Sequence, residues 1–142
     1  LFIRFSYTLT TGITMPSIYE RRIFMHSEDF TLIENFKSLM RQAMLYAQYS
    51  HDCIFDESAN NSVAISYLNV AASKFAASEA LYYSQFAVLE RDEAEEIFHL
   101  FDSYMSELLT NYKTDHSHQW TDIEFNRLKE TFDSSAFAFE NH

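Results

Sequence analysis

The chain has 142 residues, 47% of them hydrophobic and 22% charged, with one glycine, one proline and one cysteine. This length suits one domain, which buries roughly two-thirds of its unfolded surface without a metal or a disulfide. The composition excludes collagen-like, disulfide-scaffold and low-complexity chains. The scarcity of glycine and proline disfavours a β-rich fold, because tight turns depend on those residues.

Acidic residues outnumber basic ones, and the net charge is −11. The excess is uneven, because residues 1–26 carry a net charge of +2 whereas residues 27–142 hold seven basic and twenty acidic side chains. Such a negative surface repels phosphate backbones, so no direct nucleic-acid binding is expected. It is compatible with a basic partner protein, although negative charge also serves solubility alone.

Residues 1–26 are expected to form an irregular or extended N-terminal arm, because apolar and polar residues alternate in its first part. The first residue is Leu1, and two interpretations stay open. A non-ATG start codon predicts a bacterial or phage reading frame. A natural start at Met15 or Met25 predicts that the residues before it are not native.

No glycine or proline follows Pro16, so helix boundaries are predicted from caps and polar clusters. Thr31-Leu32-Ile33-Glu34 has the form of a capping box and predicts the start of the first helix. Apolar residues then recur at helical spacing, at Ile33, Phe36, Met40, Ala43, Met44 and Ala47. The polar segment from Asp56 to Ser62 predicts the loop that follows.

Three further helices are predicted. The second runs from about Val63 to Glu90 and is rich in alanine, which favours helix and close approach between helices. The third begins at Asp92, where clustered acidic residues suit the helix dipole. The fourth begins at a second capping box led by Thr121, with Trp120 stapling its entry, and ends near Asp133.

Four helices with short connections predict an all-α fold, an antiparallel four-helix bundle formed by residues 27–142 as a single domain. No apolar run approaches the ~20 residues of a membrane span. The lone Cys53 forms no intramolecular disulfide, which fits a reducing compartment. We therefore expect a cytoplasmic protein that does not enter a membrane.

Aromatic residues are unusually abundant, with fourteen Phe, nine Tyr and one Trp. Each ring buries about 150–250 Å², so a core of this size leaves some rings at the surface. Two interpretations stay open: the rings form an interface with a partner or a second copy, or the tyrosines bury their rings and expose only their hydroxyls. The residues expected at such an interface are Tyr46, Tyr49, Tyr82, Tyr83 and Phe98.

Two patterns suggest chemistry. Glu96-Ile97-Phe98-His99 has the Glu-x-x-His spacing of di-metal helical bundles, so Glu96 and His99 are weak metal candidates, although those bundles need the motif twice. Cys53 and His51 are residue types that serve as nucleophile and base, but residues at i and i+2 do not face each other on a helix, so this spacing does not favour nucleophilic catalysis. No glycine-rich loop is present, which excludes P-loop and dinucleotide sites.

The number and length of the helices resemble those of HEPN-type bundles, which occur in bacterial toxin and defence systems. Ribonuclease members of that family carry an arginine, four to six residues and then a histidine on a late helix. Arg21 and His26 have four residues between them but precede the first predicted helix, and Arg91 and His99 are separated by seven. The resemblance therefore implies a bundle that lacks the ribonuclease motif.

We expect a non-enzymatic acidic helical protein that acts through protein–protein interaction, without a cofactor. Its expected partners are a second copy of the chain, in a homodimer, and a basic protein. Two alternatives stay open: a metal-binding or enzymatic bundle that uses Glu96 and His99, and a HEPN-like bundle of a defence or toxin system.

Overall fold

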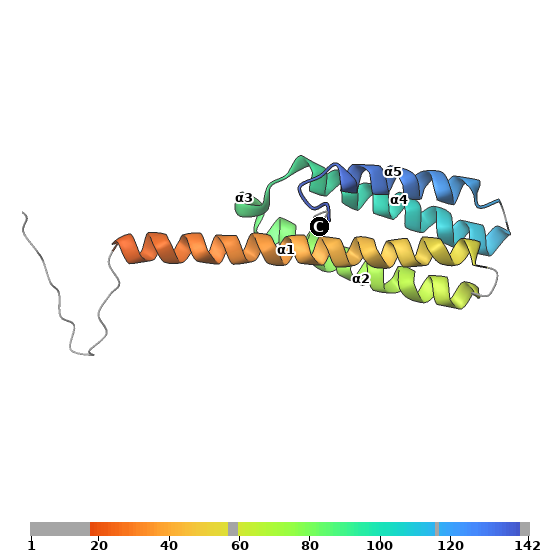
Figure 1. Cartoon of the computed structure of the whole chain (residues 1–142), viewed down its shortest axis with the longest axis horizontal. Helices are drawn as coiled ribbons and strands as arrows, with labels where there is room; N and C mark the ends of the chain where they lie inside the picture. The colour runs from red at the N-terminus through yellow and green to blue at the C-terminus, as the bar shows by residue number, and fades with distance from the viewer. Residues whose placement is uncertain (1–17, 57–59, 116, 140–142) are drawn as a thin grey trace, which may run out of the picture. The chain divides into compact units, whose positions relative to one another are not determined.

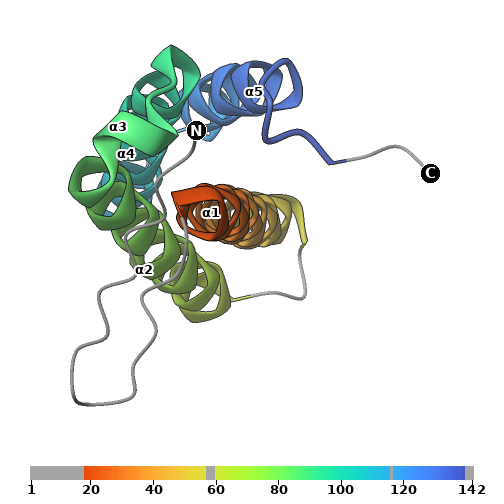
Figure 2. The same ribbon diagram turned by 90° about the vertical axis from the view of Figure 1, so that its left-hand side faces the viewer.

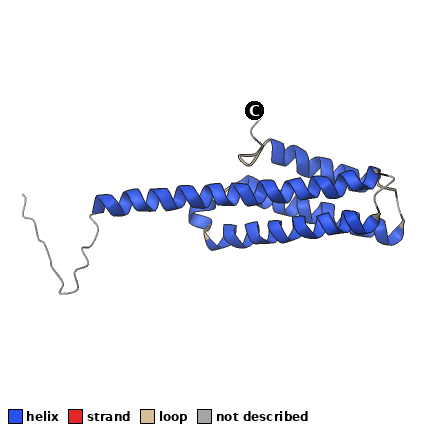
Figure 3. Ribbon diagram, turned by 60° about the horizontal axis from the view of Figure 1, so that its bottom comes forward, coloured by secondary structure: helices blue, strands red, loops and turns tan. Residues whose placement is uncertain are grey.

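The computed structural model describes residues 18–56, 60–115 and 117–139, with side chains from Ser27 onward. Within these ranges every regular element is an α-helix and no strand occurs, so the prediction of an all-α fold is confirmed (Figure 3). None of the described helices is long and apolar enough to cross a membrane. The helices are α1 (Ile18–Phe55), α2 (Asn61–Ser84), α3 (Phe86–Leu89), α4 (Asp92–Thr114) and α5 (Gln119–Asp133).

The chain divides into two compact units, Leu1–Leu32 and Ile33–His142, and α1 contributes residues to both. In the first unit, the Thr31 hydroxyl donates a hydrogen bond of 2.9 Å to the Ser27 carbonyl, as it does inside a helix. The predicted helix start at Thr31 is therefore wrong. No glycine or proline interrupts the chain between Ile18 and Thr31, so nothing stops the helix from extending upstream.

The predicted arm covers two kinds of residue. Residues 1–17 lie outside the described residues, whereas residues 18–26 belong to α1 and are helical, not irregular. The helical part of this segment has the same cause as the early helix start, because Ile18–His26 contains no helix breaker.

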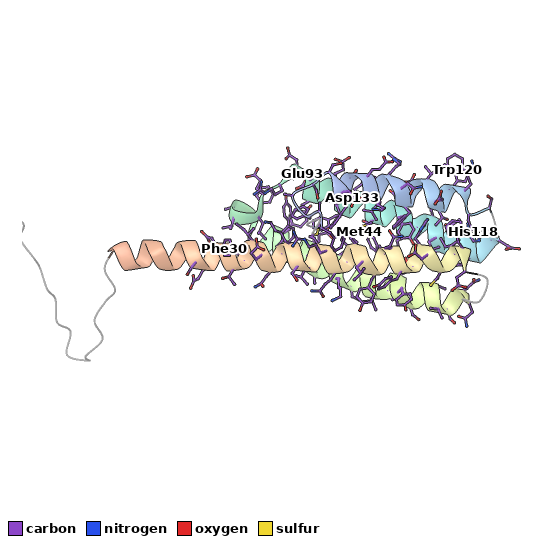
Figure 4. The ribbon with its side chains drawn as sticks, in the orientation of Figure 1. Phe30, Met44, Glu93, His118, Trp120 and Asp133 are labelled. Carbon is purple, nitrogen blue, oxygen red and sulfur yellow. The ribbon has the colours of Figure 1, made fainter. Side chains whose placement is uncertain are left out.

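In the second unit, the core face of α1 matches the predicted stripe. Its buried residues recur every three or four positions, as one face of a helix requires. They are Phe36, Met40, Ala43, Met44, Ala47, Ser50 and His51. Figure 4 shows Met44 on the side of α1 that is turned toward the other helices of this unit.

Aromatic rings join α2 to its neighbours. Phe75 of α2 lies 4.2 Å, ring centre to ring centre, from Phe101 of α4. Tyr82, about two turns further along α2, contacts Phe36 of α1 at 6.0 Å and Phe98 of α4 at 5.9 Å. In Figures 1 and 2, α2 lies beside both α1 and α4, so its buried face serves two neighbours.

An asparagine caps the start of α2, and an aspartate ends α4 where many helices have a glycine. The Asn60 side chain accepts a hydrogen bond of 3.1 Å from the Val63 N–H and caps α2. Asp115 ends α4 in the left-handed conformation, with φ at 54°, and its N–H donates to the Asn111 carbonyl. Aspartate tolerates this conformation better than most residues, so α4 ends without a glycine.

α4 and α5 form the next hairpin. The predicted start of α4 at Asp92 is confirmed, with Asp92, Glu93 and Glu95 in its first turn. The prediction that a second capping box at Thr121 starts the last helix is wrong. α5 begins at Gln119, and the buried Thr121 hydroxyl instead accepts a hydrogen bond of 3.4 Å from the Asn111 amide.

Trp120 does not staple the entry of α5. It lies in the first turn of α5 with 64% of its surface exposed, and its side chain points outward in Figure 4. The predicted end of the helix at Asp133 is confirmed, and the chain then turns back toward α1. Phe137 is buried against Phe36, and the Arg41 guanidinium donates to the carbonyls of Phe137 and Ala138.

A buried hydroxyl pair links α1 to α4. Ser50 Oγ and the Tyr104 hydroxyl are 2.7 Å apart, and Ser50 also donates to the Ala47 carbonyl. Burial raises the pKa of Tyr104 far above its ordinary value, and the hydrogen bond with Ser50 opposes the shift only in part. Tyr104 also contacts the ring of Phe125 in α5, with ring centres 5.2 Å apart, so this side chain connects α4 to two other helices.

Phe36→Ala tests the aromatic core. Phe36 is 1% exposed and contacts Tyr82 and Phe137, so its truncation leaves a cavity between α1, α2 and the C-terminal turn. We expect the free energy of unfolding, measured by urea denaturation, to fall by about 3–5 kcal/mol. The control Trp120→Ala removes an exposed ring and is expected to change it by about 0.5 kcal/mol or less. Equal losses in the two variants would contradict this assignment of the core.

Alkaline pH tests the burial of Tyr104. In the unfolded chain a tyrosine ionises near pH ~10, whereas the fold keeps Tyr104 neutral because its pKa is raised. The stability that this shift contributes is complete below that pH and is lost as the pH rises toward the folded pKa. Above pH ~10 we expect the unfolding free energy of Tyr104→Phe to decline less steeply than that of the wild type. The two slopes are expected to differ by up to about 1.4 kcal/mol per pH unit. Parallel declines in urea denaturation series would show that Tyr104 ionises normally in the fold.

Candidate functional site

Three tyrosines from two helices form a cluster of rings on the second unit. Tyr46 and Tyr49 come from α1 and Tyr67 from α2, and we call them the tyrosine cluster. The centre of the Tyr49 ring lies 5.9 Å from that of Tyr46 and 5.5 Å from that of Tyr67. Tyr46 and Tyr67 are 6.2 Å apart, so each ring contacts the other two.

The local sequence explains why these rings are partly exposed. Tyr46 and Tyr49 are three residues apart, which places them on one side of α1, next to the stripe that holds Ala47 and Ser50. Because Ser50 is bonded to Tyr104, this side of α1 turns away from α4. Tyr49 is 41% exposed, and Tyr46 and Tyr67 are half-buried.

The cluster already receives one cation. Lys74 Nζ of α2 lies 5.9 Å from the centre of the Tyr46 ring, within the range of a cation–π interaction. The same ammonium donates a hydrogen bond of 2.7 Å to Gln42 Oε1 of α1. One end of the cluster is therefore matched to positive charge within the chain.

At the other end of the cluster is a pocket of about 220 Å³, which we call the tyrosine–aspartate pocket. Tyr49 and Tyr67 supply its aromatic wall, α1 supplies Asp52 and Cys53, and Asp56 follows directly after the end of α1 at Phe55. Asp52 lies in the last turn of α1 and Asp56 is the first residue after this helix, and both border the pocket. None of the five lining residues is basic.

The tyrosine–aspartate pocket is electrostatically negative. Burial raises the pKa of the Cys53 thiol, and the carboxylates of Asp56 and Asp52 raise it further. A thiol with a raised pKa keeps its proton at neutral pH, which disfavours the thiolate that nucleophilic chemistry requires. The pocket is therefore better suited to holding a cation than to thiol catalysis.

The predicted interface residues have different positions in the structure. Tyr49 and Tyr83 are exposed at 41% and 56%, and Tyr46 is half-buried, so these three are accessible. The expected exposure of Tyr82 and Phe98 is wrong, because they are 1% and 6% exposed. Whether the accessible rings form an interface stays a prediction.

Tyr82 and Phe98 are buried because α2 and α4 face each other at their positions. The Tyr82 ring meets the Phe98 ring, and its hydroxyl donates to the Arg91 carbonyl at 3.3 Å. That bond allows a phenol to lie in the core. Helical spacing already carried this signal, because Tyr82 is seven residues after Phe75 and therefore shares its face.

Sequence reasoning missed Tyr67, Lys74 and the aspartates of the pocket. Tyr67 and Lys74 are seven residues apart on α2, a spacing that puts them on one face and was a usable signal. Nothing in the spacing alone shows that this face meets Tyr46 across the gap between two helices. That contact depends on how α1 is rotated, which the Ser50–Tyr104 hydrogen bond determines.

Glu96 and His99 lie on α4 and are both exposed. His99 borders an open groove of about 520 Å³ between α4 and α5, where Glu124 pairs with Arg127 at 3.1 Å. Glu96 is not among the residues that line it. Among the described residues, no group of three or more His, Cys, Asp or Glu side chains is arranged to hold a metal ion.

His51 is positioned by α5. Its Nε2 lies 2.9 Å from Asp122 Oδ1, and its ring stacks on Phe125 at 4.0 Å with an angle of 14°. The carboxylate accepts this hydrogen bond, so Nε2 carries the proton. Nδ1 is buried without a hydrogen-bond partner, 3.9 Å from Asp52 Oδ1. His51 thus joins α1 to α5 beside the tyrosine–aspartate pocket.

Comparisons of the chain with protein-family models, with curated proteins and with solved structures found no match. The tyrosine cluster and the adjoining pocket are therefore interpreted from their own geometry and charge.

Proposed function

We propose that this chain is a non-enzymatic, acidic four-helix-bundle protein that binds a basic partner protein through the tyrosine cluster. The observation that carries the proposal is Lys74, whose ammonium lies over Tyr46 at one end of the cluster. A lysine or arginine of a partner can make the same contact with the exposed ring of Tyr49.

The contacts of α1 support the antiparallel bundle within this proposal. α1 meets α2 through Tyr46 and Tyr67, α4 through Ser50 and Tyr104, and α5 through His51. Figure 1 supports alternating directions, since α2 runs back along α1 and α5 runs back along α4. Such an arrangement holds the tyrosine cluster on helices, which position a binding surface more rigidly than loops do.

The charge of the chain supports a basic partner over an apolar one. The net charge is −11, and the rings of the tyrosine cluster are bordered by the carboxylates of Asp52 and Asp56. Opposite charge accelerates encounter and excludes acidic competitors, while the aromatic rings supply contact area. The proposal includes a cytoplasmic location, which the lone cysteine supports because intracellular thiols stay reduced.

A labelled polyarginine peptide tests the binding surface. We expect the wild-type chain to bind it in fluorescence anisotropy titrations, with an affinity that falls as salt screens the charges. Tyr49→Ser and Tyr67→Ser are expected to weaken binding by about two- to fivefold at constant net charge, because each removes one ring from the cation site. Trp120→Ser, which removes an exposed ring from α5, is the control and is expected to bind as the wild type does.

Equal affinities of all three serine variants and the wild type would overturn the proposal. In that case the peptide would be responding to net charge alone, and the tyrosine cluster would have no part in recognition. Affinity that does not change with salt would also count against a basic partner.

A homodimer is a second candidate interaction, and a different surface favours it. Tyr83 at the end of α2 and Phe86 in α3 are exposed at 56% and 41%, and both pack against the buried Tyr82. Exposed rings supported by a core residue are suited to self-complementary contact across a two-fold axis.

Light scattering during size-exclusion chromatography tests this homodimer. We expect a mass of two chains at high protein concentration and of one chain for the double variant Tyr83→Ser/Phe86→Ser, because both apolar contacts are removed. Trp120→Ser is the control, since it removes a more exposed ring from α5. A wild-type monomer at all concentrations, or a dimer that survives the double variant, would reject this interface.

A further inference from the structure

The tyrosine–aspartate pocket allows a more specific assignment, which rests on the proposed function. We infer that this pocket is an arginine site: it takes the guanidinium group of a single arginine side chain from the basic partner. The guanidinium would pair with Asp52 and lie against the rings of Tyr49 and Tyr67.

The shape of the pocket suits a flat cation on a flexible stem. Its volume of about 220 Å³ is larger than an ammonium group needs and allows the planar head of arginine to enter with part of its stem. The rings of Tyr49 and Tyr67 are 5.5 Å apart and inclined at 56°, so a guanidinium can stack on one ring while its edge meets the other.

The charges of the pocket are complementary to arginine. The Asp52 side chain is 60% exposed, and one of its oxygens accepts a hydrogen bond of 2.7 Å from Gln48 Nε2. That bond orients the carboxylate on α1 and leaves its second oxygen for an N–H of the guanidinium. The carboxylates of Asp52 and Asp56 both line the pocket, and a bound cation would offset their negative charge.

The two ends of the tyrosine cluster differ in what they already hold. At the Tyr46 end, Lys74 supplies a cation from within the chain. At the Tyr49 end, the five lining residues are aromatic, acidic or thiol, and none supplies one. The same ring cluster thus has an internally filled cation position and a second position that is matched to an external cation.

The test is an NMR titration of the full chain with Nα-acetyl-arginine amide. We expect saturable shifts of backbone amides around Tyr49, Cys53 and Tyr67. The citrulline analogue has nearly the same shape without the charge and is expected to cause no saturable shift. The lysine analogue is expected to bind more weakly, because an ammonium does not stack on a ring face as a planar guanidinium does.

Two variants locate the ligand. Asp52→Asn and Tyr67→Leu are each expected to weaken arginine binding by about two- to fivefold, since each removes one exposed charge or ring contact. Glu130→Gln removes an exposed acid from α5, and Trp120→Leu removes an exposed ring from the same helix; both controls are expected to bind as the wild type does. Unchanged amide spectra outside the pocket show that each variant is folded.

The inference is overturned if citrulline shifts the same amides, if lysine binds as tightly as arginine, or if Asp52→Asn and Tyr67→Leu leave the affinity unchanged. Its failure is distinguishable from failure of the proposed function. If polyarginine binding depends on Tyr49 while arginine amide produces no shift at the pocket, only the arginine site is wrong. If polyarginine binding is also indifferent to the tyrosine cluster, the proposed function is wrong as well.

Discussion

The hydrogen bond between Ser50 and Tyr104 is the constraint on which the arrangement of the second unit depends. A tyrosine hydroxyl inside a helical core requires a polar partner, and Ser50 is the residue on α1 that provides it. Once this pair is formed, the rotation of α1 about its axis is set. The side of α1 that carries Met40, Ala43 and Ala47 must face inward, and the side that carries Tyr49 must face the solvent beside α2.

That rotation produces a surface on which acidic groups border a cluster of aromatic rings. The rings provide contact area, and the carboxylates make the surface selective for positive charge, so neither alone accounts for the proposed recognition. His51 stabilises the part of α1 that carries this surface, because its hydrogen bond to Asp122 and its stacking on Phe125 attach α1 to α5. The proposed site therefore stands on two helix-to-helix connections rather than on a loop.

Regular spacing made much of the fold predictable. The inward residues of α1, the acidic start of α4 and the end of α5 follow from patterns in the sequence. The capping boxes at Thr31 and Thr121 predicted the wrong helix starts, because a four-residue motif does not show whether the residues before it are already helical. Thr31 lies inside α1, and Thr121 lies in the first turn of α5, where its hydroxyl satisfies Asn111. The site itself was harder to foresee, since ring counts do not say which rings are covered.

The C-terminal turn illustrates a related limit on reading sequences. Arg41 donates hydrogen bonds to the main-chain carbonyls of Phe137 and Ala138, so the contact with Ala138 involves only its backbone. These two hydrogen bonds do not depend on the side chain of Ala138, whereas they do depend on Arg41, because lysine, with its single nitrogen, is a poor substitute for a guanidinium that spans two acceptors. In natural variants of this chain, this contact would therefore be recognised by an arginine retained at position 41 while the residue at position 138 varies.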